Sequence, residues 1–203
     1  MLITVLLIAV TCAVSITCFS NASLLERLLL WPPGLRGGQY DRLVTNAFVH
    51  ADGAHLAFNM ITLFFFGRAV EPFFERYIGM VGFALFYLGA AVVSVAPSVM
   101  RHWDDSRYRS LGASGAVSAV LFAFILLAPW TTIYVFVIPV PAIVYAAAFL
   151  AYGLYAGRLG HDHINHSAHL WGAAFGVVFA LVMEPRLASV FIQRLMNPSF
   201  GLY

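Results

Sequence analysis

The chain has 203 residues, of which 62% are hydrophobic and only 10% are charged, and its mean hydropathy is +0.86. A soluble domain carries about 25% charged residues, so this composition excludes a disordered chain, a disulfide-rich secreted scaffold and a nucleic-acid-binding module. The net charge of +2 is too small an excess to bind nucleic-acid phosphates. We therefore expect an all-α integral membrane protein.

Six segments of the sequence are apolar and long enough to be transmembrane helices, which need about 20 residues. Their approximate limits are 2–19, 54–70, 79–99, 111–128, 133–154 and 167–183. The first is expected to be a membrane anchor rather than a cleaved signal peptide, because no basic residue precedes its apolar run. The sequence shows no internal repeat and no second domain. Residues 1–203 are therefore predicted to form one domain, a bundle of six helices.

The second, fourth and sixth segments all begin on the same side of the membrane, because every crossing reverses the direction of the chain. Their first turns carry unusual polar residues. These are His55 and Asn59, Ser114, and His169. Polar residues within a membrane are costly to bury and mark functional sites. Their convergence on one layer of one leaflet predicts a site there.

The fourth segment begins with Gly112-Ala113-Ser114-Gly115, which indicates a nucleophile. The two glycines leave room for the backbone of a substrate. The N-terminus of a helix also has unpaired N–H groups with positive character, which can stabilise an oxyanion beside the serine. The alternative is a tightly packed helix start, because Gly and Ser are common in membrane helices.

A serine nucleophile needs a base, and His169 is the candidate. It lies on the extension of a ridge of small residues spaced by four, and the fourth segment has a matching ridge. The two ridges consist of Gly172, Gly176 and Ala180 and of Gly115, Ala119 and Ala123. Small ridges let membrane helices approach closely, as a direct Ser–His hydrogen bond requires. Taken alone, His169 could instead be a structural histidine bonded to a neighbouring helix.

His55 and Asn59 are four residues apart and share one face of the second segment. Both side chains can donate a hydrogen bond to an oxyanion, although interhelical hydrogen bonding is a fair alternative. No carboxylate is an obvious third member of a triad. Asp162 precedes His169 in a loop and is expected not to contact it, so the sequence favours a Ser–His dyad.

Several short motifs occur together in a specific order and spacing. They lie at 42–45, at 50–60, at 67–71, at 112–115 and at 168–176. With these motifs the sequence resembles the rhomboid family of intramembrane serine proteases, in its basic six-span bacterial form, over nearly the whole chain. The resemblance implies that Ser114 is the nucleophile and His169 the general base. It also implies that His55, Asn59 and the backbone N–H of Ser114 surround the oxyanion.

The resemblance further implies a partly membrane-embedded loop between the first two segments. The implied substrates are single-span transmembrane helices, cut near one surface of the lipid bilayer without a cofactor, metal or nucleic acid. The implied location is the bacterial inner membrane. The family usually has a Trp-Arg pair in the first loop, whereas here Asp41 precedes Arg42, which puts the docking of that loop in doubt.

Two other functions fit parts of the sequence. His161, His163, His166 and His169 lie close together and suggest a metal site. However, the His-Glu-x-x-His glutamate of a metalloprotease is absent from the sequence, and a transporter would place its polar groups near the bilayer midplane. An inactive rhomboid relative that binds membrane clients is the second alternative. The presence of both Ser114 and His169 favours an enzyme.

The arginines and the resemblance disagree on orientation. Seven arginines lie on the side of the predicted site and four on the other side, so the positive-inside rule places the site toward the cytoplasm. The resemblance places it outside, with both termini in the cytoplasm, and we adopt that orientation. Neither the particular substrate nor the oligomeric state follows from the sequence.

Overall fold

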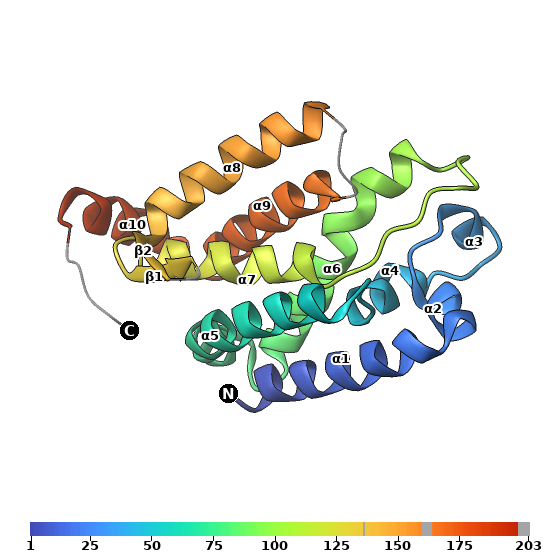
Figure 1. Cartoon of the computed structure of the whole chain (residues 1–203). Helices are drawn as coiled ribbons and strands as arrows, with labels where there is room; N and C mark the ends of the chain where they lie inside the picture. Colours follow the sequence, from blue (N-terminus) through green and yellow to red (C-terminus); the bar gives the residue numbers. More distant parts are fainter. Residues whose placement is uncertain (136, 160–163, 199–203) are drawn as a thin grey trace.

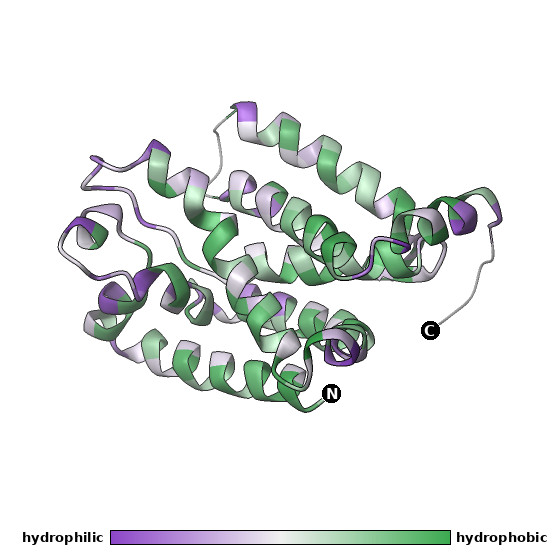
Figure 2. Cartoon of the chain, turned by 180° about the vertical axis from the view of Figure 1, so that it is seen from behind, coloured by the Kyte–Doolittle hydropathy of each residue, from purple (hydrophilic) through white to green (hydrophobic). Residues whose placement is uncertain are grey.

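The computed structural model of the chain describes residues 1–135, 137–159 and 164–198. Its architecture is a bundle of long apolar helices (Figure 1). These are α1 (Leu2–Ser20), α5 (Gly53–Ile78), α6 (Gly82–Arg101), α7 (Ser114–Leu127), α8 (Ala142–Leu159) and α9 (His166–Met183). Within the described ranges, five are long and apolar enough to cross a membrane, and α7, with 14 residues, is shorter. The prediction of an all-α membrane protein is confirmed. Figure 2 shows apolar residues along the helices and hydrophilic residues gathered in loops and at helix ends.

The short helix α7 forms the centre of the bundle, and in Figure 1 it runs between α5 and α9. Every residue from Gly115 to Leu126 is buried, as expected of a helix that is hydrophobic all round. Its 14 residues span about 21 Å, whereas the hydrocarbon core of a bilayer is about 30 Å thick. If the C-terminal end of α7 reaches one membrane surface, Ser114 at its N-terminal end therefore lies below the opposite surface.

The helices α7 and α9 pack along the two ridges of small residues. A Cβ atom added to Gly172 would overlap the backbone carbonyl of Gly115, and one added to Gly176 would overlap that of Ala119. The two backbones are thus in direct contact, which only small residues permit.

The prediction of a helix over 133–154 is wrong at its N-terminal end. A β-hairpin of β1 (Thr132–Val135) and β2 (Ile138–Pro141) precedes α8, and Thr132 pairs with Pro141. Proline lacks the N–H that a helix interior needs and disfavours helical geometry in the residue before it. Pro139 and Pro141, together with the β-branched residues around them, therefore favour an extended chain. Helix α8 starts only after the second proline.

One further helix departs from its predicted limit, and one helix after the last predicted segment was not predicted. The helix α5 continues past the predicted end at residue 70 and through Pro72, because Phe74 is fully buried and stacks on Phe86 of α6 at 4.2 Å. Tertiary packing here outweighs the loss of one helical hydrogen bond. A further amphipathic helix, α10 (Leu187–Met196), follows α9 and buries only Leu187.

The first helix is fixed to α5 by a buried carboxylate. Glu71 has no exposed surface and accepts hydrogen bonds from the backbone N–H groups of Ile3 and Thr4 at 2.8 and 2.9 Å. The hydroxyl of Thr4 donates to the same carboxylate. Glu71 thus satisfies donors at the start of α1 that have no partner within that helix.

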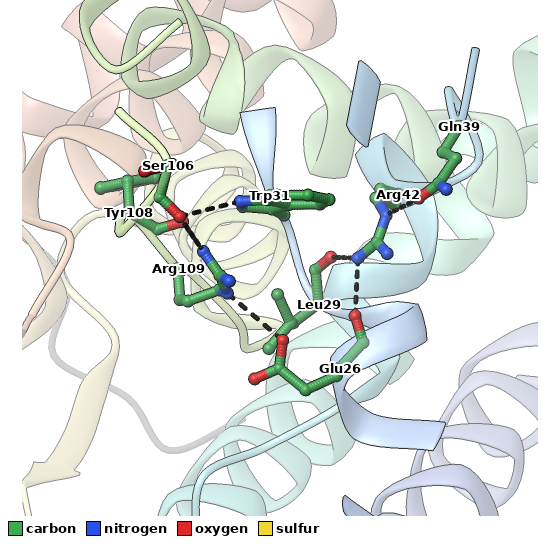
Figure 3. A network of polar contacts seen from close by, with 8 residues as sticks. All are labelled: Glu26, Leu29, Trp31, Gln39, Arg42, Ser106, Tyr108 and Arg109. Carbon is green, nitrogen blue, oxygen red and sulfur yellow. Dashed lines mark hydrogen bonds and ion pairs between the residues drawn. The ribbon is translucent and has the colours of Figure 1, made fainter. Parts of the chain in front are cut away.

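The loop between α1 and α5 contains four short helices. They are α2 (Ala22–Leu28), α3 (Pro32–Arg36), α4 (Arg42–Thr45) and η1 (Asn46–Phe48). Arg42 is buried at the centre of this loop and donates to the backbone carbonyls of Glu26 and Leu29 at 2.8 and 2.7 Å, and to the Gln39 side chain at 2.6 Å (Figure 3). The loop is therefore folded around Arg42.

Trp31 binds this first loop to the loop that precedes α7. Its ring lies between the guanidinium groups of Arg42, at 5.8 Å, and Arg109, at 5.1 Å, and its N–H donates to the Ser106 carbonyl at 3.1 Å (Figure 3). The neighbouring residue, Leu30, exchanges backbone hydrogen bonds with Ser110 at 2.8 and 3.1 Å. A tryptophan therefore does contact Arg42, although it comes from another position in the sequence. The loop docks despite the replacement at position 41.

Candidate active site

Ser114 and His169 come together at the starts of α7 and α9. The Nε2 atom of His169 lies 2.7 Å from the hydroxyl oxygen of Ser114, and both residues are half-buried. This is hydrogen-bond distance for a nucleophile and its base. The direct contact between Gly172 and Gly115, one turn away, sets this short separation. Phe149 of α8 stacks on the other side of the site, with its ring centroid 6.1 Å from that of His169.

The turn before Ser114 is held by hydrogen bonds from the first loop. The N–H of Gly112 donates to the carbonyl of Asn46 at 2.9 Å, and the N–H of Ala113 donates to the Nε2 atom of His50 at 3.3 Å. Ser114 is the first residue of α7, so its own N–H has no acceptor within the helix. This arrangement leaves the Ser114 N–H as the donor beside the hydroxyl.

The two predicted glycines next to Ser114 have different surroundings. Gly112 has a φ of 118°, which favours glycine, and a Cβ there would lie 2.7 Å from the His55 ring. Gly115 packs against Ser94 of α6 and the carbonyl of Ala168. Its contacts fit the predicted role in helix packing, whereas Gly112 borders the site itself.

His55 and Asn59 lie on the first turns of α5. The carboxylate of Asp52 accepts from the backbone N–H of His55 at 2.8 Å and caps this helix. Asn59 is buried and donates one amide N–H to the His55 carbonyl at 2.9 Å, which leaves its second N–H for another acceptor. Both side chains line the same cavity as Ser114 and His169.

That cavity is lined by residues of five helices, α5 to α9. Phe58 and Phe65 line it from α5, and Tyr145 and Phe149 line it from α8. Its lining is mostly apolar, and it includes the polar residues of the site as well as arginines such as Arg68, Arg101 and Arg158. A largely apolar cavity that also holds a few polar groups suits a hydrophobic polypeptide.

Asn165 holds the start of α9 and was missed in the sequence. Its side-chain oxygen accepts from the Ala168 N–H at 3.1 Å and from the Ser98 hydroxyl at 3.0 Å. Its amide donates to the Tyr108 hydroxyl at 3.0 Å and to the Ser110 hydroxyl at 3.3 Å. An asparagine directly before an apolar helical run is a helix-cap signal that could have identified it.

Several predictions concern residues outside the described ranges. Asp162, His161 and His163 lie there. His166 is buried, with its ring centroid 6.1 Å from that of His169. Within the described part of the chain, there is no group of three or more His, Cys, Asp or Glu residues that could hold a metal ion.

The fold and the site together define a class of protein: a multi-pass helical membrane protein with a hydrogen-bonded serine and histidine that line a cavity. The comparison with known families agrees with this class. The Rhomboid domain model matches residues 37–186, and the chain therefore belongs to the rhomboid family.

Individual relatives come from several sources. The chain is 33% identical over 172 residues to the RHOMBOID-like protein 12, mitochondrial, of Arabidopsis thaliana, covering 79% of this chain and 51% of that protein. It is 32% identical to the Rhomboid protein 1, mitochondrial, of Saccharomyces cerevisiae, over 68% of this chain and 40% of that one. It is also 32% identical to the Rhomboid protease GluP of Bacillus subtilis, over 79% of this chain and 29% of GluP.

The chain thus spans about half or less of the length of these relatives. Two of these relatives are named as mitochondrial proteins, and the third, from a bacterium, is named as a protease. The comparisons therefore support a multi-pass membrane protein of a family that includes proteases, and they give no support to the bacterial inner membrane in particular.

Proposed function

We propose that the protein is an intramembrane serine endopeptidase that cleaves transmembrane helices with a Ser–His dyad. The observation that carries the proposal is the 2.7 Å separation between the Ser114 hydroxyl and His169 Nε2, two residues that line a largely apolar cavity. A serine at a helix N-terminus, with a base at hydrogen-bond distance, has the arrangement of a nucleophile in acyl transfer.

In the proposed reaction, the Ser114 oxygen attacks the scissile carbonyl while its proton passes to His169 Nε2. The negative charge that develops on the carbonyl oxygen is stabilised by the Ser114 N–H and by the side chains of His55 and Asn59. His169 then gives the proton to the leaving amine, and an acyl-enzyme on Ser114 remains. A water molecule, deprotonated by His169, hydrolyses the ester and restores the serine.

The substrates are proposed to be single-span membrane proteins. The cavity has a mostly apolar lining that a hydrophobic helix can contact. A helix hides its carbonyls in hydrogen bonds, so it must unwind before attack, and unsatisfied polar groups in lipid cost several kcal/mol each. Cleavage is therefore expected near one surface, where water satisfies those groups.

The direct test is cleavage of a generic transmembrane substrate by the purified protein, compared with Ser114→Ala. We expect cleavage by the wild-type protein and none by the variant. Binding of the substrate without cleavage by the wild type would favour the client-binding alternative.

The remaining expectations stay predictions. They are a single domain over 1–203, a bacterial inner membrane and a site that faces away from the cytoplasm. A cysteine introduced at the exposed Trp103, in the loop before α7, tests the orientation. A membrane-impermeant thiol reagent should label it from outside the cell. Labelling only after the membrane is permeabilised would support the arginine distribution instead.

A further inference from the structure

His50 lies in the loop between η1 and α5, and its side chain has no exposed surface. One ring nitrogen, Nε2, lies 3.3 Å from the backbone nitrogen of Ala113, the residue before the nucleophile. The other, Nδ1, lies 2.9 Å from the hydroxyl oxygen of Ser15 on α1. His50 therefore joins the first helix to the turn that carries Ser114.

The neighbours of His50 determine which ring nitrogen carries the proton. The Ala113 N–H can only donate, so Nε2 accepts and is unprotonated. The Ser15 hydroxyl donates to the Phe48 carbonyl at 2.9 Å, so its oxygen accepts the N–H of Nδ1. When the His50 ring is neutral, the Ala113 N–H, both ring nitrogens and the Ser15 hydroxyl each have a hydrogen-bond partner. Burial, with the nearby His55, lowers the pKa of His50 to about 4, in agreement with a neutral ring.

His50 also contacts the side of the site that faces α5. Its ring packs edge to face against the ring of His55, with the centroids 4.9 Å apart. The His55 ring in turn lies against Gly112. One buried side chain therefore touches both the turn before the nucleophile and one of the proposed oxyanion donors.

We propose that His50 is a positioning residue that holds the Gly112–Ala113 peptide so that the hydroxyl and N–H of Ser114 face the scissile carbonyl. The proposal rests on the protease function proposed above. The turn needs support because Gly112, with its φ of 118° and no side chain, restricts the backbone less than another residue would.

The burial of Ala113 makes this support specific. Ala113 has no exposed surface, so its N–H would be buried without a partner if His50 did not accept from it. The peptide would then rotate toward another acceptor and move Ser114 away from His169. A displacement of about 1 Å can reduce the rate about 100-fold. Because both nitrogens of His50 are engaged, it acts through this turn and not as a second base.

Two substitutions separate the two hydrogen bonds of His50. A glutamine side chain reaches about as far as Nε2, so His50→Gln keeps an acceptor for Ala113. An asparagine side chain reaches only as far as Nδ1, so His50→Asn keeps a partner for Ser15 and leaves Ala113 without one. The experiment measures kcat, KM and melting temperature of the purified full-length variants on a transmembrane substrate.

In His50→Asn we expect kcat to fall about 10- to 100-fold while KM stays within about twofold. In His50→Gln we expect kcat to fall by less than about threefold. A merely structural role would instead lower kcat in both variants in proportion to the fall in their melting temperatures. That result, or wild-type kcat in His50→Asn, would overturn the proposal.

Hydrogen–deuterium exchange of the Ala113 amide gives a readout that does not depend on cleavage. Exchange should be faster in His50→Asn and near the wild-type rate in His50→Gln. If the wild-type protein cleaves nothing, the proposed function fails, while the exchange rates still test the support of the turn; equal rates in all three proteins would overturn it.

Should neither His50 variant fold, Ser15→Ala takes their place, because it removes the acceptor of the Nδ1 proton. We then expect faster Ala113 exchange and a kcat roughly threefold to tenfold lower. Unchanged kcat with unchanged exchange would contradict the proposal.

Discussion

Two of the helices that pack against α9, α7 and α8, differ strongly in how much of their surface is buried. In α7, 12 of the 14 residues are buried, and its backbone touches that of α9 at Gly115 and Ala119. In α8, only four of the 18 residues are buried, and Tyr155 remains 65% exposed. The tightly packed α7–α9 pair carries the Ser–His hydrogen bond, and the more exposed helix α8 contributes a further part of the cavity lining.

This contrast matches two different demands on a protease that works on helices. A dyad needs a fixed separation between nucleophile and base, because small displacements are costly in rate. Access for a substrate helix instead needs a wall that can move. In the proposed protease, lateral access beside α8 and chemistry at the tightly packed α7–α9 pair would satisfy both demands. The predictions below test the two regions, beginning with the largest effect.

Removing either member of the dyad should have the largest effect. Ser114→Ala and His169→Ala should each lower kcat by roughly four orders of magnitude or more, because nucleophile and base act as a unit. For the same reason the double variant should be hardly worse than either single one. Initial rates on a transmembrane substrate measure this. Substantial activity in His169→Ala would require a different base.

Separation of the α7 and α9 backbones should have the second-largest effect on the rate. In Gly172→Leu the new side chain would collide with the Gly115 carbonyl, so the helices must move apart. A shift of about 1 Å should lower kcat about 100-fold or more without removal of a reacting group. Ala148→Leu, at an exposed position on α8, is the matched control and should keep near-wild-type activity. Full activity in a folded Gly172→Leu protein would refute the packing account.

Loss of an oxyanion donor should have a smaller effect. Asn59→Ala should lower kcat by roughly 10- to 1000-fold, the range for one such donor, and His55→Ala should act similarly or less. Neither side chain is in the α7–α9 interface, so KM and the melting temperature should change little. A change confined to KM would mean that these residues only hold the substrate.

Changes in the substrate test the proposed access beside α8. Glycine or proline near the end of the substrate span that faces the site should promote cleavage, because these residues weaken a helix by about 1 to 3 kcal/mol each. Replacing them with leucines should protect the substrate, and a glycine pair at the far end should create no new site. Mass spectrometry of the fragments locates the cut. Efficient cleavage of a uniform polyleucine span would contradict the unwinding argument.

Acid should destabilise the fold through His50, which supports the turn before α7. An unfolded histidine binds its proton near pH 6.5, but in the fold the pKa of His50 is about 4. The unfolded chain is therefore favoured as the pH falls from about 6.5 to 4, and this residue alone should lower the free energy of unfolding by roughly 3 kcal/mol. Melting temperatures at both pH values measure the loss. In His50→Gln the loss should be smaller; an equal loss would show that other groups cause it.

The sequence predicted the features of this comparison that depend on local spacing. The apolar segments and the ridges of small residues can be read from the periodicity of each helix, and the common level of Ser114 and His169 follows from the number of crossings between them. The hairpin before α8 was missed because its apolar residues satisfy a helix as well as a strand, and only Pro139 and Pro141 distinguish the two.

Contacts between distant loops could not be read in the same way. Trp31 packs on Arg42, but nothing in the spacing of these residues indicates it. Likewise, His50 meets Ala113 only because the loop between α1 and α5 folds back onto the start of α7. Such contacts depend on tertiary packing of irregular backbone, for which periodicity gives no signal.

The most direct test of the central claim, that the tight α7–α9 pair activates a serine, is labelling with a fluorophosphonate. This reagent reacts with activated serines, and peptide mass spectrometry locates the adduct. The account predicts an adduct on Ser114 in the wild-type protein, little or none in His169→Ala and Gly172→Leu, and a near-normal yield in Ala148→Leu. An adduct at another residue, or labelling of Ser114 that survives both His169→Ala and Gly172→Leu, would contradict it.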